Sequence, residues 1–181
     1  MIVLETERLL FRDHEPRDLE PFCAIEMDAE VRRFVGGFPR TRREAGKRFG
    51  ELLRSKSTLP FCAAVLKESG EYIGRCGLHP LPVWQPALRL APRPDGPRAY
   101  AALGFYLARR YWGRGLATEA ARAFVDYGFR QLKLPRIVAT AEVGNDASIR
   151  VLEKAGFELV AVEEGDGRSF RHYAVTAWPS P

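Results

Sequence analysis

The chain has 181 residues, of which 46% are hydrophobic and 28% charged, and its formal net charge is +5 at pH 7. This length fits one domain, so we expect one folded unit over residues 1–181 that needs no disulfide or metal to stabilise it. Basic residues are interspersed with acidic ones, and no helix carries a basic stripe with aromatic residues between. The pattern argues against nucleic-acid binding.

Cysteine usage and hydropathy exclude further classes of protein. Cys23, Cys62 and Cys76 are too few and too scattered for a disulfide framework or a zinc site, so we expect buried thiols in a reducing compartment. The first ten residues carry three charges within their apolar run, and no later stretch is long enough to cross a membrane. We therefore expect a cytoplasmic protein without membrane contact.

Strands and helices are both predicted, with a strand–helix–strand unit at the centre of the chain. In order, we expect a strand over 6–12, helices over 16–29 and 41–55, strands over 61–66, 72–78 and 101–108, a helix over 116–129, a strand over 137–143, a helix over 147–155, and strands over 157–162 and 170–177. Thr41 and Glu44 have the spacing of a capping box. The central unit implies a right-handed parallel crossover, and the flanking hairpins make the sheet mixed.

A proline-rich segment, 79–98, interrupts this alternation. Its composition predicts a long loop or a hairpin extension with proline-blocked edges. Loops of this length are usually functional or mobile, so the segment is a candidate flap on the substrate side.

Two glycines, Gly113 and Gly115, lie directly before the helix that begins near Leu116. Glycines at this place let several backbone N–H groups point into one concavity, which forms an anion site with the positive end of the helix dipole. Arg110 and Arg114 add charge at its rim. A lone Gly-x-Gly is common in strand-to-helix turns, and the loop lacks the further residues of a phosphate loop or a dinucleotide fingerprint. The cradle alone therefore does not name its ligand.

The residues around the cradle resemble a known family. Trp112-Gly113-Arg114-Gly115-Leu116-Ala117-Thr118-Glu119-Ala120 is similar to the signature of GNAT acetyltransferases, in which Arg/Gln-x-x-Gly-x-Gly/Ala binds the coenzyme A pyrophosphate; Arg110, Gly113 and Gly115 take those positions. Residues 145–157, Asn-Asp-Ala-Ser-Ile-Arg-Val-Leu-Glu-Lys-Ala-Gly-Phe, resemble the second element of the branch that acetylates ribosomal-protein N-termini (RimJ/RimL-like), and residues 4–12 resemble its first strand. The resemblance spans nearly the whole chain. It implies an α/β GNAT fold: a mixed, mostly antiparallel seven-stranded sheet flanked by helices, with the parallel unit at its centre.

The resemblance also implies acetyl-CoA as co-substrate and acetyl transfer to a primary amine in a ternary complex without a metal. In the family the pantetheine arm lies where two strands splay apart, and a backbone N–H polarises the acetyl carbonyl and stabilises the oxyanion. Phe105 and Leu107 would be core strand residues in any case. Carried over by position, the cofactor-binding residues are Phe105, Tyr106, Leu107, Arg110, Gly113, Arg114, Gly115, Ala117, Thr118 and Asn145.

Three polar residues are candidates for catalysis. Asn145 matches the position that hydrogen-bonds the pantetheine arm or a water near the amine, and it would also cap the following helix. Ser148 matches the hydroxyl that protonates the departing thiolate, or else it satisfies its own first-turn backbone. The family's strand Glu and Tyr general acid are replaced by Ala102 and Leu152. His79 is the best replacement base by location, although a lone histidine is more often a simple hydrogen-bonding residue.

The loss of a strong base favours an amine that is already partly neutral. Roughly a tenth of an α-amine is neutral at pH 7, against a few parts in ten thousand of a lysine amine. We therefore expect an N-terminal or other low-pKa amine that reacts mainly by positioning, with a water-mediated base. Glu142 and His172 are weaker candidates for the base than His79.

Two other interpretations stay open. The acceptor could be a small molecule such as an amino acid, polyamine or aminoglycoside; the three arginines and single acid of residues 79–98 suit an acidic or neutral one. A non-catalytic sensor of acetyl-CoA is supported by the missing Glu and Tyr and opposed by Ser148. The sequence leaves the acceptor and the oligomeric state, monomer or homodimer, undetermined.

Overall fold

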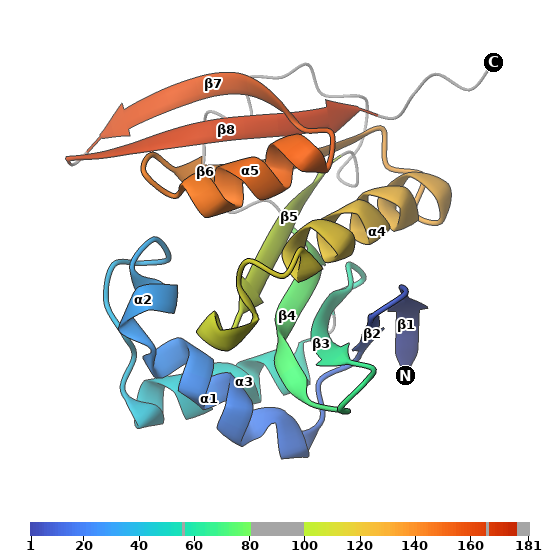
Figure 1. Cartoon of the computed structure of the whole chain (residues 1–181), viewed down its shortest axis with the longest axis vertical. Coiled ribbons are helices and arrows are strands. Elements are labelled where there is room, and N and C mark those ends of the chain that lie inside the picture. The colour runs from blue at the N-terminus through green and yellow to red at the C-terminus, as the bar shows by residue number, and fades with distance from the viewer. Residues whose placement is uncertain (56, 81–99, 166, 177–181) are drawn as a thin grey trace.

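A computed structural model describes residues 1–55, 57–80, 100–165 and 167–176, in which eight strands form one mixed sheet (Figure 1). The sheet order is β1-β2-β3-β4-β5-β6-β8-β7, and only β5 and β6 pair in parallel. The strands are β1 (Ile2–Glu5), β2 (Leu9–Arg12), β3 (Phe61–Leu66), β4 (Tyr72–His79), β5 (Tyr100–Leu107), β6 (Arg136–Glu142), β7 (Glu158–Gly165) and β8 (Arg168–Thr176). This confirms the predicted fold class, with one strand more than the seven expected. The proline-rich segment lies almost wholly outside the described residues.

The additional strand arises at the chain start, where the predicted strand over 6–12 is wrong in its first three residues. The Thr6 N–H donates to the Leu9 carbonyl over 2.9 Å, which closes a turn between β1 and β2. The Thr6 hydroxyl and the Arg8 side chain bond to Glu119 of a distant helix, at 2.6 and 2.7 Å. Because these contacts are made across the fold, the local pattern of apolar residues does not show them.

The helices follow the predicted order, with one break that was not expected. They are η1 (Pro16–Asp18), α1 (Leu19–Met27), α2 (Ala29–Arg32), α3 (Arg42–Arg54), η3 (Arg109–Tyr111), α4 (Leu116–Arg130) and α5 (Asp146–Lys154). The helix predicted over 16–29 ends at Met27, because Asp28 takes an extended conformation and its side chain caps α2. The Thr41–Glu44 capping box is present as predicted.

Both faces of the sheet are covered, as the helices on either side of β4 in Figure 1 show. Alternation along β3 places Cys62 and Ala64 in the same apolar cluster as α4, while Ala63 packs with α1 and α3. The thiols are buried and unpaired, and burial raises the pKa of Cys62 to about 12. The predicted burial of the three thiols is thereby confirmed.

His14 lies in the second of these clusters, among the rings of Phe22, Phe49 and Tyr72 at centroid distances of 6.0 to 6.4 Å. Burial, followed by the charge of Arg75, lowers the pKa of His14 to about 4. The imidazole is therefore neutral at pH 7, and its protonation opposes folding.

Within the described ranges, no helix has the length and apolar character needed to cross a membrane, and no group of three or more potential ligands is placed to hold a metal ion.

Candidate active site

The site is built where β5 and β6 separate. Their parallel ladder has three residue pairs and ends at Ala102 opposite Val138, although β5 continues to Leu107 and β6 to Glu142. Beyond Ala102, β5 is paired with β4 along one edge and, among the strands that the structure describes, has no partner along the other. Backbone groups on the other side are thereby left to bind an extended ligand in the gap, as the resemblance predicts for a pantetheine arm.

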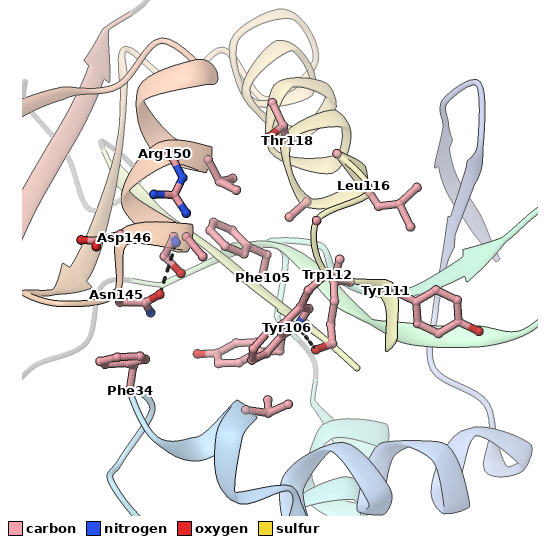
Figure 2. A pocket seen from close by; sticks show the side chains of 18 of the residues that line it. Phe34, Phe105, Tyr106, Tyr111, Trp112, Leu116, Thr118, Asn145, Asp146 and Arg150 are labelled. Atoms are coloured by element: carbon pink, nitrogen blue, oxygen red, sulfur yellow. Dashed lines mark hydrogen bonds between the residues drawn. The ribbon is translucent and has the colours of Figure 1, made fainter. Parts of the chain in front are cut away.

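A cavity of about 530 Å³ opens at this gap, and Figure 2 shows its side chains arranged between α5, the end of β5 and the segment after α2. Most of the predicted cofactor-binding residues line it. They are Phe105, Tyr106, Leu107, Gly113, Gly115, Ala117, Thr118 and Asn145. Ser148 lines it as well. The structure thus brings together residues of the two sequence motifs.

The glycine loop has the geometry of an anion cradle. Gly113 and Gly115 have φ angles of 73° and 76°, which side chains other than glycine adopt only with strain. Gly115 is the N-cap of α4. The first hydrogen bond of the helix runs from the Glu119 N–H to the Gly115 carbonyl. The N–H groups of the first turn, at residues 116–118, therefore lack helical acceptors, and all three of these residues line the cavity.

The side chains of the two arginines of the loop lie outside the cavity lining. Arg110 pairs with Glu71 at 3.0 Å, and Arg114 lies over the ring of Tyr111 at 5.6 Å. Among the described residues, the cavity lining includes neither arginine. Within the glycine loop, the groups that face the cavity are therefore backbone groups, and contacts of the Arg110 and Arg114 side chains with a pyrophosphate stay a prediction.

A second cavity, of about 320 Å³, adjoins the first. Its lining includes residues of β4, β5, β6 and β8, among them His79, Thr140 and Phe170. Both cavities share the side chains Phe34, Val35, Phe105, Tyr106, Asn145 and Ser148. A donor in the first cavity and an acceptor in the second would meet at this junction, which we call the transfer junction.

Tyr106 is fixed at the junction by a buried ion cluster. The Arg75 guanidinium lies 4.4 Å from the Tyr106 ring centroid and bonds to Glu26 at 2.5 Å. Arg40 bonds to the same carboxylate at 2.7 Å. Burial alone raises the pKa of Glu26, but the charge and hydrogen bond of Arg75 outweigh this and hold it below its usual range. Glu26 therefore stays ionised, and its ion pair with Arg75 holds the guanidinium against the Tyr106 ring.

Asn145 and Ser148 are linked through the helix cap that the sequence predicts. The Asn145 side-chain oxygen accepts the Ser148 backbone N–H over 3.2 Å. We expect Asn145→Ala to lower the free energy of unfolding by about 1 kcal/mol, because the first turn of α5 loses its cap. Urea unfolding would measure this loss, and Asn145→Asp, which can still cap, is the control. Equal stability of all three proteins would contradict the capping role.

The two positions that depart from the family pattern, Ala102 and Leu152, both line the second cavity. His79 lines it too: its Nδ1 bonds to the Pro80 carbonyl at 2.9 Å, and a Cβ on Gly104 would come within 3.2 Å of its Nε2. Burial lowers the pKa of His79, so the ring is neutral at pH 7 and Nε2 is the free acceptor. This geometry allows His79 to accept a proton in the cavity.

The comparisons decide the family. The model described as "Acetyltransferase (GNAT) domain" matches residues 8–158. The chain belongs to the GNAT acetyltransferase family. This GNAT protein is 32% identical over 162 residues to the uncharacterized N-acetyltransferase p20 of Bacillus licheniformis, a match covering 87% of the chain and 83% of p20. A GNAT-family acetyltransferase structure from Bacillus anthracis matches 97% of the chain and 98% of its own length, with a TM-score of 0.79 and 23% identity.

The predicted activity and co-substrate follow from this membership: the GNAT protein is an acetyl-CoA-dependent N-acetyltransferase acting on an amine acceptor. Shorter matches include proteins with different acceptors in their names. The putative ribosomal N-acetyltransferase YdaF of Bacillus subtilis is 38% identical over 68 residues, covering 38% of the chain and 35% of YdaF. Spermidine N(1)-acetyltransferase of Escherichia coli is 36% identical over 53 residues, covering 29% and 28%.

Several lining residues of this GNAT site were not predicted from the sequence. Phe34 and Val35 follow α2 and line both cavities, and Figure 2 shows the Phe34 ring beneath Asn145. Thr140 and Arg168 come from neighbouring strands and line the second cavity. Alternation along β6 and β8 would have placed these two on one face, but no motif marks them as functional.

Proposed function

We propose that this enzyme transfers the acetyl group of acetyl-CoA to a protein N-terminal α-amine, as the ribosomal-protein branch of the family does. The observation that carries the proposal is the charge of the second cavity. Among the described residues that line it, Glu142 is the one carboxylate, and its charge is neutralised by an ion pair with Arg168. A cavity without a free carboxylate does not select a polycation, whereas a single amine on a neutral backbone suits it.

The apolar replacements at Ala102 and Leu152 support the same acceptor. They remove the carboxylate and the phenol that would accept or donate protons directly. Both positions line the second cavity, which we call the acceptor cavity. An α-amine, with a pKa of about 8, requires less of a base than a lysine amine at about 10.4. Positioning of the amine at the transfer junction then lowers the activation barrier by several kcal/mol.

The residues at the transfer junction have roles in this reaction. The neutral amine attacks the acetyl carbonyl, and the oxyanion that forms is stabilised by free backbone N–H groups along the end of β5. Ser148, half-buried on the first turn of α5, passes its hydroxyl proton to the departing thiolate and regains a proton from water, so that the hydroxyl is restored. The amine proton leaves through a water or a cavity side chain, for which His79 is one candidate.

The proposal is tested with a mass-coded acceptor panel. The protein and acetyl-CoA are incubated with peptides of varied free N-termini, N-blocked lysine peptides, polyamines, aminoglycosides and amino acids, and mass spectrometry identifies the acetylated members. We expect acetylation confined to free N-termini. An N-blocked lysine peptide acetylated as efficiently as any α-amine would refute the proposal.

A small-molecule amine is the second candidate acceptor, because the second cavity holds only about 320 Å³ among its described walls. That volume fits a single small amine as well as the end of a peptide. Acetylation of an amino acid or another small amine in the panel, with no peptide product, would favour it. Acetyl-CoA binding without any product would instead favour the sensor interpretation.

A further inference from the structure

A chain of hydrogen bonds runs from the acceptor cavity through three neighbouring strands. Thr140 Oγ1 of β6 lies 3.0 Å from His172 Nδ1 of β8, and His172 Nε2 lies 2.9 Å from Glu163 Oε2 of β7. Thr140 and His172 are direct partners in the β6–β8 register. Thr140 lines the cavity, the His172 side chain is 1% exposed, and that of Glu163 is 39% exposed. The chain therefore connects the cavity to solvent through a buried imidazole.

The Glu163 carboxylate at one end determines the direction of these hydrogen bonds. An ionised carboxylate can only accept, so Glu163 takes the hydrogen on His172 Nε2. In the neutral imidazole Nδ1 is then unprotonated and accepts the Thr140 hydroxyl proton. The Thr140 oxygen keeps its lone pairs for a donor in the cavity. A carboxylate that orients an imidazole, which in turn accepts from a hydroxyl, is an arrangement that moves protons in many enzymes.

We propose that Thr140, His172 and Glu163 form the proton relay that deprotonates the acceptor amine. The inference rests on the proposed amine acceptor. The acceptor ammonium donates a proton to Thr140 Oγ1 as the Thr140 hydroxyl proton passes to His172 Nδ1. The products are a neutral amine, an intact threonine hydroxyl and an imidazolium paired with the Glu163 carboxylate, and the imidazolium later returns its proton to water. The relay supplies the base that Ala102 does not.

A proton relay predicts a pH dependence of the reaction rate that a purely structural role of these residues does not. Among the described residues, the charged and titratable groups around it are Glu163 from β7, the Glu142–Arg168 pair from β6 and β8, and His79 of β4 on the same cavity. A base is needed while the amine is protonated and becomes unnecessary above the pKa of the amine, at about 8. Loss of the relay should therefore reduce the rate at pH 6.5 and much less at pH 9.

The main test uses Thr140→Val, which keeps the shape of the side chain but removes its hydroxyl. We expect kcat at pH 6.5 to fall by about 30-fold, because roughly 3% of an amine with a pKa of about 8 is neutral at that pH, with the affinity for acetyl-CoA in calorimetry unchanged. Thr140→Ser should restore most of the rate. A defect of equal size at pH 6.5 and pH 9, or no defect, would overturn the relay, as would a pH-dependent loss confined to His79→Ala.

Glu163 is tested as a positioning residue. Glu163→Gln can still accept from His172 but cannot pair with an imidazolium, so we expect about a 10-fold lower kcat at pH 6.5, a KM for the amine within twofold, and recovery at pH 9. Glu164→Gln, at an exposed neighbour on the same strand, is the matched control and should behave as the unaltered enzyme. Equal effects of the two substitutions would contradict the role of Glu163.

A measurement without turnover separates this inference from the proposed function. The chain has three histidines, so ¹⁵N NMR can assign their ring tautomers. We expect His172 to carry its proton on Nε2. A proton on Nδ1 in the neutral ring would overturn the relay, even in an enzyme that acetylates α-amines. If no amine is acetylated, the proposed function fails, while the tautomer still decides whether the hydrogen-bond chain has the required direction.

Discussion

Replacing Ser148 by alanine is expected to lower kcat by about 100-fold while leaving the affinity for acetyl-CoA within twofold. The hydroxyl lies at the transfer junction, which both cavities share. A general acid that protonates a leaving group contributes typically about 10²- to 10⁴-fold. Acetyl-CoA affinity should persist, because the backbone N–H groups of the cradle and the walls of the gap are unchanged.

Ser148→Ala should remove the hydroxyl without disturbing the cap of α5. The Asn145 side chain caps α5 through the backbone N–H of Ser148, which alanine retains. Thermal unfolding should therefore be nearly unchanged for Ser148→Ala, whereas Asn145→Ala loses stability. Steady-state kinetics and calorimetry with coenzyme A provide the readouts. A wild-type kcat in Ser148→Ala would show that the thiolate departs without this hydroxyl.

Acid should destabilise the protein well above the pH at which carboxylates titrate, because of His14. Its pKa is about 4 in the folded protein, against about 6.5 unfolded. Below pH 6.5 the unfolded chain binds a proton that the folded one does not, so stability falls as the pH is lowered. The contribution present at neutral pH is lost between pH 6.5 and 4, and we expect this group alone to remove about 3 kcal/mol.

Urea unfolding between pH 7 and 4.5 measures this effect. His14→Phe, which keeps an aromatic ring among Phe22, Phe49 and Tyr72, should flatten the slope of stability against pH. Burial also lowers the pKa of His79, so part of the slope should remain in that variant and decrease further when His79→Gln is added. An unchanged slope in His14→Phe would show that the ring is solvated and titrates normally.

Local signals in the sequence were enough to predict much of the fold and the donor side of the site. The glycine loop, the Asn145 cap and the Thr41–Glu44 capping box depend on residues within a few positions of one another. The break at Asp28 was not predicted, because an aspartate can also continue a helix, whereas here its side chain accepts the backbone N–H groups of Glu30 and Val31 and starts α2.

The acceptor side could be predicted much less well. Phe34 reaches the junction from a segment without a motif, and the Thr140–His172 contact depends on strand register between residues 32 positions apart. His172 was only a weak base candidate in the sequence, which does not show that its partners come from two other strands. Residues that act through cross-strand contacts have no fixed spacing in the chain, so periodicity and motif cannot identify them.

The bonds between Glu119 and the turn of residues 6–8 have a consequence for dynamics. Arg8 also donates to the Arg114 carbonyl over 2.9 Å, so the β1–β2 hairpin holds both the glycine loop and the first turn of α4. Local opening of this hairpin would release the cradle, and a ligand that binds the closed form must therefore slow that opening. Coenzyme A should accordingly protect amides of the first two strands from hydrogen exchange. The affinity for the cofactor is in this way partly set at the far edge of the sheet.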